Sequence, residues 1–316
     1  MYHKLIDTVC FLLCSAIISF AQSAKEIETL KELNHKQNIV YKIIDGDTLD
    51  MILFLPGVKA GSKMPVMVFI HGGGWGGGNK YKIAGAPFFG TVQTLLNNGI
   101  ACSTIEYRLT RAGKSTVFDC VVDCKDAVRF LMKNADEFSL DANRVGVWGD
   151  SAGGHLCLMT ALADNKTFNG DDSLKNYKPW FLCVASYFPL TSFVNPEYLK
   201  GSNFEDPKRF IPLLGGPVSE KQELARLLSP VKWIDKNSPP VLLLHGEADN
   251  VLPISQSIYF EEVGKERGAD VQLLKVKNAG HSFNGENISP SMDDINKLAA
   301  EYIIAKLKVE KNKRNL

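Results

Sequence analysis

Short, wholly apolar runs alternate along the chain with longer stretches in which apolar residues recur every three or four positions. A run such as 66–70 offers no polar side to water, so it is typical of a strand covered on both faces. The longer stretches are typical of amphipathic helices. The predicted strands are 38–45, 49–55, 66–70, 100–106, 144–148, 181–187, 240–244 and 271–276. The predicted helices are 87–97, 117–133, 152–163, 253–267 and 291–308.

Because strands and helices alternate, we expect a single α/β domain over 22–316, with a mostly parallel central sheet and helices on both faces. The first two strands are joined by a tight turn around Gly46, which predicts an antiparallel N-terminal hairpin. The stretch 164–229 breaks the alternation with polar residues, prolines and glycines. Within it we predict a small cap or lid insertion over 191–228.

The N-terminus follows a different pattern. Residues 8–20 are almost wholly apolar, and thirteen residues are too few to cross a bilayer comfortably. Small residues, Ser19 and Ala21, stand three and one positions before a cut after Ala21, and charge returns at Lys25. This predicts a signal peptide over 1–21, a secreted or periplasmic protein, and no stable membrane insertion after cleavage. A buried or amphipathic N-terminal helix is the alternative.

Charge and cysteine content narrow the classes of function. The 316 residues carry 36 basic against 35 acidic side chains, a net charge of +1, so we expect no nucleic-acid partner. No Cys/His cluster has the spacing of a zinc site. Five of the seven cysteines follow the predicted signal, so at least one thiol is free unless two chains are bridged. The five are Cys102, Cys120, Cys124, Cys157 and Cys183.

The first of two glycine-rich loops follows the predicted strand 144–148. Residues 149–153 read GDSAG, a match to G-x-S-x-G between a strand and a helix. A nucleophile at such a sharp turn needs small neighbours, because the chain folds back on itself there. We therefore predict Ser151 as the nucleophile. The N–H of Ala152 opens the following helix, whose dipole favours negative charge.

The second loop, HGGGW at 71–75, directly follows the strand 66–70. Successive glycines let backbone N–H groups approach a developing oxyanion, and HGGG is typical of lipases and esterases. We predict Gly73 and Gly74 as oxyanion donors together with Ala152, and Trp75 as a substrate-binding residue. A phosphate-binding loop is disfavoured because no Lys-Ser/Thr pair follows.

A serine nucleophile needs a base, and the base needs an orienting carboxylate. The expected chain order is serine, acid, histidine, with each residue in a loop after a strand. We predict His281 as the base and Asp249 as the acid. Glu247 is the rival acid, but it stands less far into its loop. Packing is the expected role of His155, and loop orientation that of His245.

Taken together, these motifs resemble the α/β-hydrolase superfamily, and within it the hormone-sensitive-lipase-like carboxylesterases. HGGGW and GDSAGG carry the resemblance, and EYRL at 106–109 is similar to a segment common in these enzymes. With HGEAD at 245–249, the chain looks most like secreted bacterial esterases that remove acetyl or feruloyl groups from plant xylan. The resemblance covers about 38–308. It implies the α/β-hydrolase fold, a Ser151–His281–Asp249 triad, the oxyanion hole named above, and no metal or organic cofactor.

The resulting hypothesis is a secreted serine carboxylesterase that hydrolyses short-chain or aromatic esters through an acyl-enzyme. Its expected partner is a small ester or an esterified oligosaccharide. An amide hydrolase, either a compact serine peptidase or a formamidase-like enzyme, is the alternative on the same fold. A non-catalytic binding protein is a third reading, against which the intact nucleophile, base, acid and oxyanion loop argue. The oligomeric state stays open.

Overall fold

The computed structural model describes residues 25–59 and 61–308. The predicted signal segment 1–21 and its cleavage site lie outside the described residues. Among the described residues, no helix is both long enough and apolar enough to cross a membrane. The strands are β1 His35–Ile44, β2 Asp47–Phe54, β3 Met64–Ile70, β4 Ala101–Ile105, β5 Leu140–Asp150, β6 Phe181–Tyr187, β7 Val241–Gly246 and β8 Val271–Val276. The larger helices are α2 Ala86–Asn97, α3 Val117–Lys133, α4 Ala152–Leu162, α7 Ser255–Glu266 and α8 Met292–Leu307.

One eight-stranded sheet forms the centre of the molecule, in the order β1-β2-β4-β3-β5-β6-β7-β8. β1 and β2 form an antiparallel hairpin, and β2 also lies antiparallel to β4. From β4 to β8 every neighbouring pair is parallel. The prediction of a mostly parallel sheet with an antiparallel N-terminal hairpin is confirmed.

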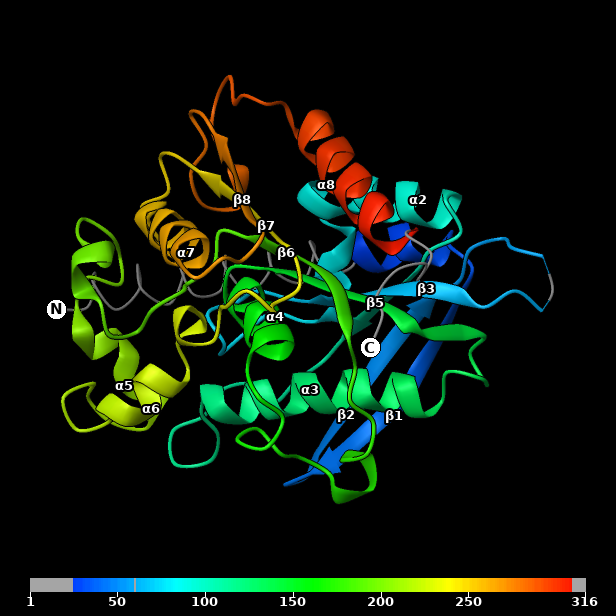
Figure 1. The fold of residues 1–316 in the computed structure, drawn as a ribbon, viewed down its shortest axis with the longest axis horizontal. Helices are drawn as coiled ribbons and strands as arrows, with labels where there is room; N and C mark the ends of the chain where they lie inside the picture. Colours follow the sequence, from blue (N-terminus) through cyan, green and yellow to red (C-terminus); the bar gives the residue numbers. More distant parts are fainter. Residues whose placement is uncertain (1–24, 60, 309–316) are drawn as a thin grey trace, which may run out of the picture.

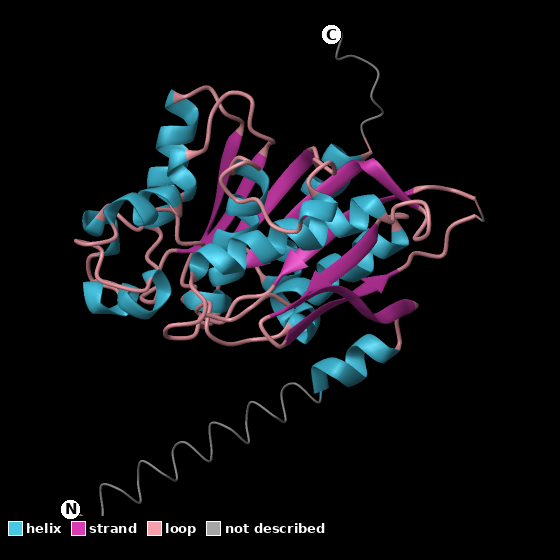
Figure 2. Ribbon diagram, turned by 90° about the horizontal axis from the view of Figure 1, so that it is seen from below, coloured by secondary structure: helices cyan, strands magenta, loops and turns pink. Residues whose placement is uncertain are grey.

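Helices pack on the faces of the sheet (Figure 2). α2 and α8 lie on one side, and α3 and α4 lie on the other (Figure 1). β3 shows why its sequence is apolar throughout. Val66, Val68 and Ile70 join the core beneath α3 and α4, whereas Met67 and Phe69 join the core beneath α2 and α8. Successive side chains of a strand point to opposite faces, so both sets must be apolar.

β5 is longer than predicted from the sequence, which suggested 144–148. Polar residues, Asp141, Asn143 and Arg144, stand near its start, and before Val145 only Leu140 pairs with β3, opposite Met64. The carboxylate of Asp141 accepts from the N–H of Asn143 and from Arg144. The strand is therefore extended by hydrogen bonds of the Asp141 side chain and by the pairing of Leu140 with Met64. A search for apolar runs does not detect such an extension.

The segment 191–228 folds into short helical turns beside the C-terminal ends of the strands (Figure 1). They are η3 Pro196–Leu199, η4 Pro207–Phe210, α5 Ile211–Leu214 and α6 Gln222–Leu227. The N–H of Asn203 donates to the carbonyl of Asn250, 2.9 Å away, in the loop after β7. The segment is thus attached to a loop at the edge where β5, β6 and β7 end. Its role as a cap stays a prediction.

Candidate active site

Ser151 stands at the apex of the turn from β5 into α4. Its backbone has φ 54° and ψ −118°, a conformation that side-chain-bearing residues rarely adopt. Its N–H donates to the carbonyl of Tyr187 at the end of β6, at 2.8 Å. Such strain persists only where neighbouring structure imposes it, and it gathers at functional sites.

The two glycines of the motif allow this turn to pack against the end of β3. A Cβ on Gly149 would stand 2.5 Å from the carbonyl oxygen of Ile70. A Cβ on Gly153 would stand 2.6 Å from the carbonyl oxygen of His71, and closer still to that of Ile70. Glycine is required at both positions because backbone atoms occupy the space.

The three predicted triad side chains form one hydrogen-bonded chain. His281 Nε2 lies 2.9 Å from Ser151 Oγ, and His281 Nδ1 lies 2.7 Å from Asp249 Oδ2. A carboxylate only accepts, so Nδ1 carries the proton and Nε2 accepts from the serine hydroxyl. The ring of Phe188 meets the His281 ring edge-on, with centroids 4.7 Å apart. The imidazole is therefore fixed in the orientation that a general base requires.

Asp249 is buried and held by its own loop. Its Oδ1 accepts from the N–H groups of Val251 and Leu252, while His245 Nε2 lies 3.3 Å from Oδ2. Burial by itself raises the pKa of this carboxyl, but the interactions with His245 and His281 outweigh burial and hold its pKa well below the usual range. The group is thus a carboxylate at neutral pH.

The alternatives weighed from the sequence lie elsewhere. Glu247 is exposed and takes no part in the hydrogen-bonded chain. His245 is fully buried, with Nδ1 2.7 Å from Ser257 Oγ and Nε2 2.8 Å from the carbonyl of Leu252. It therefore supports the loop of Asp249, the role predicted for it.

The oxyanion loop has the backbone that its glycines permit. Gly73 and Gly74 have φ of +133° and +60°, and a Cβ on Gly73 would collide with the carbonyl of Gly77. Both residues line the same pocket as Ser151. Ala152 is the first residue of α4, so its N–H has no acceptor within the helix. Two of the predicted donors thus line the pocket with Ser151, and the third directly follows Ser151 in the chain.

Asp150 links this loop to the turn that holds Ser151. The sequence did not reveal this link. Its side chain is fully buried, and Oδ1 accepts from the N–H of Gly72 at 2.7 Å. Its Oδ2 lies 2.7 Å from Lys82 Nζ. Asp150, which directly precedes Ser151, therefore holds the start of the predicted oxyanion loop. Its partners are distant in sequence, so no local pattern signals them.

His71 is a structural residue of the same loop. Its ring stacks on Tyr107 at 4.4 Å between centroids, and Nε2 lies 3.4 Å from Glu106 Oε2. The Tyr107 hydroxyl donates to the carbonyl of His71 at 2.8 Å. The EYRL segment noted in the sequence thus supports the oxyanion loop from below.

A pocket of about 260 Å³ opens beside Ser151 and His281. Apolar side chains of Trp75, Phe204 and Leu252 line it, with Lys82 as a charged neighbour. This volume lies below the roughly 300–1,000 Å³ of pockets that hold drug-sized ligands, so the pocket suits one small substrate group. Trp75 lines this pocket, and its role in substrate binding stays a prediction.

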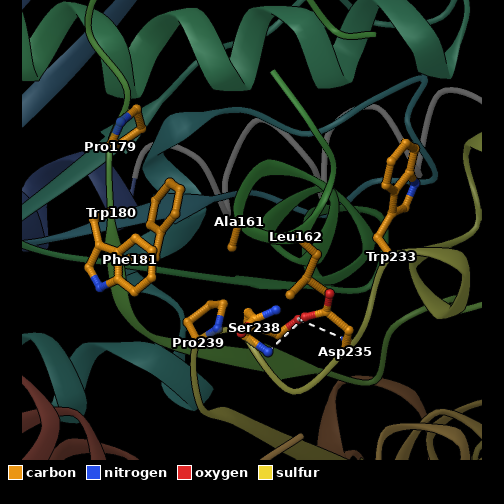
Figure 3. A pocket seen from close by; sticks show the side chains of 10 residues that line it. Ala161, Leu162, Pro179, Trp180, Phe181, Trp233, Asp235, Ser238 and Pro239 are labelled. Atoms are coloured by element: carbon orange, nitrogen blue, oxygen red, sulfur yellow. Dashed lines mark hydrogen bonds between the residues drawn. The ribbon is translucent and has the colours of Figure 1, made fainter. Parts of the chain in front are cut away.

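Figure 3 shows the side chains that line a second hollow, of about 230 Å³. It lies at the end of the sheet where β6 and β7 begin. Trp180 and Pro239 stand there, just before β6 and β7, whereas Ser151 and Asp249 follow the ends of strands. Trp180 therefore lies far from the triad. Within the described part of the chain, no cluster of His, Cys, Asp and Glu suits a metal ion.

Comparisons with known proteins agree with this geometry. Esterase LipC of Mycobacterium tuberculosis is 26% identical over 221 residues, 70% of this chain and 53% of that protein. Isoprenylcysteine alpha-carbonyl methylesterase ICME of Arabidopsis thaliana is 27% identical over 292 residues, 88% of this chain and 63% of that protein. The chain thus spans between about half and two thirds of the length of these two curated relatives.

Among solved structures, the esterase Est2 of Thermogutta terrifontis superposes with a TM-score of 0.71 at 24% identity. The alignment covers 89% of this chain and 95% of that one, which confirms the predicted α/β-hydrolase fold. The BD-FAE family model matches residues 51–263. Because this match takes in more than half of the sequence, the chain belongs to the BD-FAE family.

Proposed function

We propose that the protein is a secreted serine carboxylesterase whose triad is Ser151, His281 and Asp249. One observation carries the proposal: Ser151 Oγ, His281 and the ionised Asp249 form a continuous hydrogen-bonded chain that ends in a pocket. A base 2.9 Å from the hydroxyl is within proton-transfer reach. Family membership and relatives named as esterases support ester hydrolysis.

In the first half-reaction, Ser151 Oγ attacks the ester carbonyl as His281 Nε2 takes the hydroxyl proton. The carbonyl oxygen becomes an oxyanion, which accepts from the N–H groups of Gly73, Gly74 and Ala152. Asp249 stabilises the imidazolium that forms. His281 then protonates the leaving alcohol, and the acyl group stays on Ser151.

In the second half-reaction, His281 takes a proton from water, whose oxygen attacks the acyl-enzyme carbonyl. The same three N–H groups receive the second oxyanion. Collapse releases the acid, and His281 returns the proton to Ser151 Oγ. The protein's own side chains and backbone supply every proton transfer and charge-stabilising contact in this cycle.

For substrate, we propose acetyl or feruloyl esters of plant polysaccharide. The apolar walls of the small pocket, Trp75, Phe204 and Leu252, suit a short acyl chain or one aromatic ring. The predicted signal peptide supports a substrate met outside the cytoplasm, such as a decorated polymer.

The test is hydrolysis by the mature chain from Gln22 and by its Ser151→Ala variant. Substrates are p-nitrophenyl acetate, butyrate and octanoate, acetylated xylan and methyl ferulate. Ser238→Ala, in the hollow where β6 and β7 begin, is the matched control. We expect wild type and control to be equally active, and the Ser151→Ala variant to lose about 10⁴-fold or more in kcat.

Equal residual activity in wild type and Ser151→Ala would contradict the esterase proposal and direct attention to amide substrates. Release of acetate from xylan, or of ferulate from its methyl ester, decides between the two acyl groups. Activity on p-nitrophenyl esters with neither natural-type substrate cleaved would keep the triad and reject the polysaccharide assignment.

A further inference from the structure

His155 makes two hydrogen bonds that fix its protonation state. It is fully buried in α4, one turn beyond Ser151. The indole N–H of Trp75 donates to His155 Nδ1 at 3.1 Å, and His155 Nε2 lies 2.7 Å from the carbonyl of Leu228. An indole only donates and a carbonyl only accepts, so His155 is neutral with its proton on Nε2.

These bonds join three segments that are distant in sequence. Trp75 directly follows the predicted oxyanion donors Gly73 and Gly74, and its own backbone has φ +60°. Leu228 is the last residue of the segment 191–228. His155 therefore connects the oxyanion loop to the helix that begins at the nucleophile, and to the end of the predicted cap.

The oxyanion loop is consequently held at both ends. Asp150 holds its start through the N–H of Gly72, and His155 holds its end through Trp75. The carbonyl of Trp75 also accepts from the N–H of Thr110 at 2.8 Å. Between these anchors Gly73, Gly74 and Trp75 have positive φ. The side-chain bonds of Asp150 and His155 therefore hold this unusual backbone, and with it the direction of the loop's N–H groups.

We propose that His155 is a positioning residue for the oxyanion hole, acting through the side chain of Trp75. The proposal rests on the proposed esterase function. The side chain of His155 does not line the pocket, so its path to the reacting groups runs through Trp75, which does. Because a displacement of about 1 Å costs on the order of 10²-fold in rate, loss of the bridge should lower kcat and leave KM nearly unchanged.

Three substitutions separate this role from packing. His155→Phe keeps a flat ring of similar size and loses both bonds. His155→Asn places an amide oxygen where Nδ1 stood, so it keeps the acceptor for Trp75 and loses the bond to Leu228. His155→Gln reaches the position of Nε2, so it keeps the bond to Leu228 and loses the acceptor for Trp75.

The experiment measures kcat and KM on p-nitrophenyl acetate for these variants and for Trp75→Phe, with Tm recorded for each. We expect kcat to fall about 10- to 100-fold in His155→Phe and His155→Gln, with KM within about twofold of wild type. His155→Asn should recover most of the loss. Combining His155→Phe with Trp75→Phe should cost little more than the larger single loss.

Wild-type kcat in His155→Phe would overturn the proposal, and so would equal losses in the Asn and Gln variants. If His155→Phe does not fold, the order of the Asn and Gln variants decides alone, and a higher kcat for Gln rejects the proposal. An inactive wild type is a different outcome, since it removes the proposed function before His155 is tested.

Discussion

At the scale of single residues, the two oxygens of the Asp249 carboxylate have separate sets of partners. Asp249 uses one oxygen for its own loop and the other for His281 and His245. The imidazole of His281 therefore has one available tautomer, the one that leaves Nε2 free to accept a proton. This division of the carboxylate oxygens gives the first prediction.

Asp249→Asn should lower kcat on p-nitrophenyl acetate by about 10⁴-fold near neutral pH. An amide nitrogen facing His281 Nδ1 favours the wrong tautomer, in which Nε2 carries the proton and cannot accept one from Ser151. The matched control is Glu247→Gln, which changes the exposed acid of the same loop and should leave kcat near wild type. The reverse order of losses would transfer the acid role to Glu247.

A second prediction concerns pH and stability. Burial lowers the pKa of His155 to about 4, only partly offset by the Leu228 carbonyl, while an unfolded histidine has a pKa of about 6.5. As pH falls below about 6.5 the unfolded chain takes up this proton first, so stability is lost down to about pH 4. Titration of His155 should lower the free energy of unfolding by about 3 kcal/mol over this interval.

Urea unfolding of wild type and His155→Asn, from about pH 7 to about pH 4, measures this difference. The variant lacks the titrating group, so its unfolding free energy should fall less steeply over that interval. Parallel curves for the two proteins would show that His155 titrates normally in the folded state.

At the scale of elements, the turn between β5 and α4 depends on how closely it packs against β3. The atoms that crowd Gly153 are backbone carbonyls of Ile70 and His71, which cannot rotate away as a flexible side chain can. A methyl group there must push apart β3 and α4, whose side chains both form part of the core. The cost should therefore appear in the stability of the whole fold.

Gly153→Ala should destabilise the protein by about 3 kcal/mol, measured by urea or thermal unfolding. Gly76→Ala is the matched control, since a Cβ there meets nothing closer than 3.4 Å. The control should change the unfolding free energy by no more than about 1 kcal/mol. Similar small effects at both positions would mean that the turn relaxes away from β3 at little cost.

The strands and helices were predictable from sequence because their signals are local. The apolar run of β3 faces two cores, and the glycines of the nucleophile turn stand beside the serine. Support of the oxyanion loop was not predictable. Trp75 and His155 are 80 positions apart, and His155 and Leu228 are 73 apart. Such partners come together only in the folded protein, so the local pattern of apolar and polar residues cannot predict their contacts.

At the scale of the whole molecule, the parallel strands all finish at the same end of the sheet, and the triad side chains follow those strand ends. Ser151 follows β5, Asp249 follows β7 and His281 follows β8, so one edge of the sheet collects all three. The segment 191–228 adds Phe204 to the pocket at that same edge. Its side chain is half-buried, and its ring centroid lies 6.3 Å from that of Trp75.

Phe204→Ala should therefore enlarge the pocket beside Ser151, which we propose holds the acyl group. We expect kcat/KM on p-nitrophenyl octanoate to rise relative to acetate by about 10-fold, the effect of about one additional buried methylene. The same comparison in Phe210→Ala controls for loosening of the segment, because Phe210 contacts Phe204 without lining the pocket. An unchanged ratio in Phe204→Ala would place the acyl chain on another wall.

The five described cysteines are all buried as free thiols. Burial raises the pKa of each, so they are poor nucleophiles while the fold is intact. They are spread over β4, α3, α4 and β6. The described part of the chain therefore has no disulfide among these five cysteines. These thiols become reactive only when the core opens. The rate at which an alkylating reagent modifies them therefore reports the rate of unfolding.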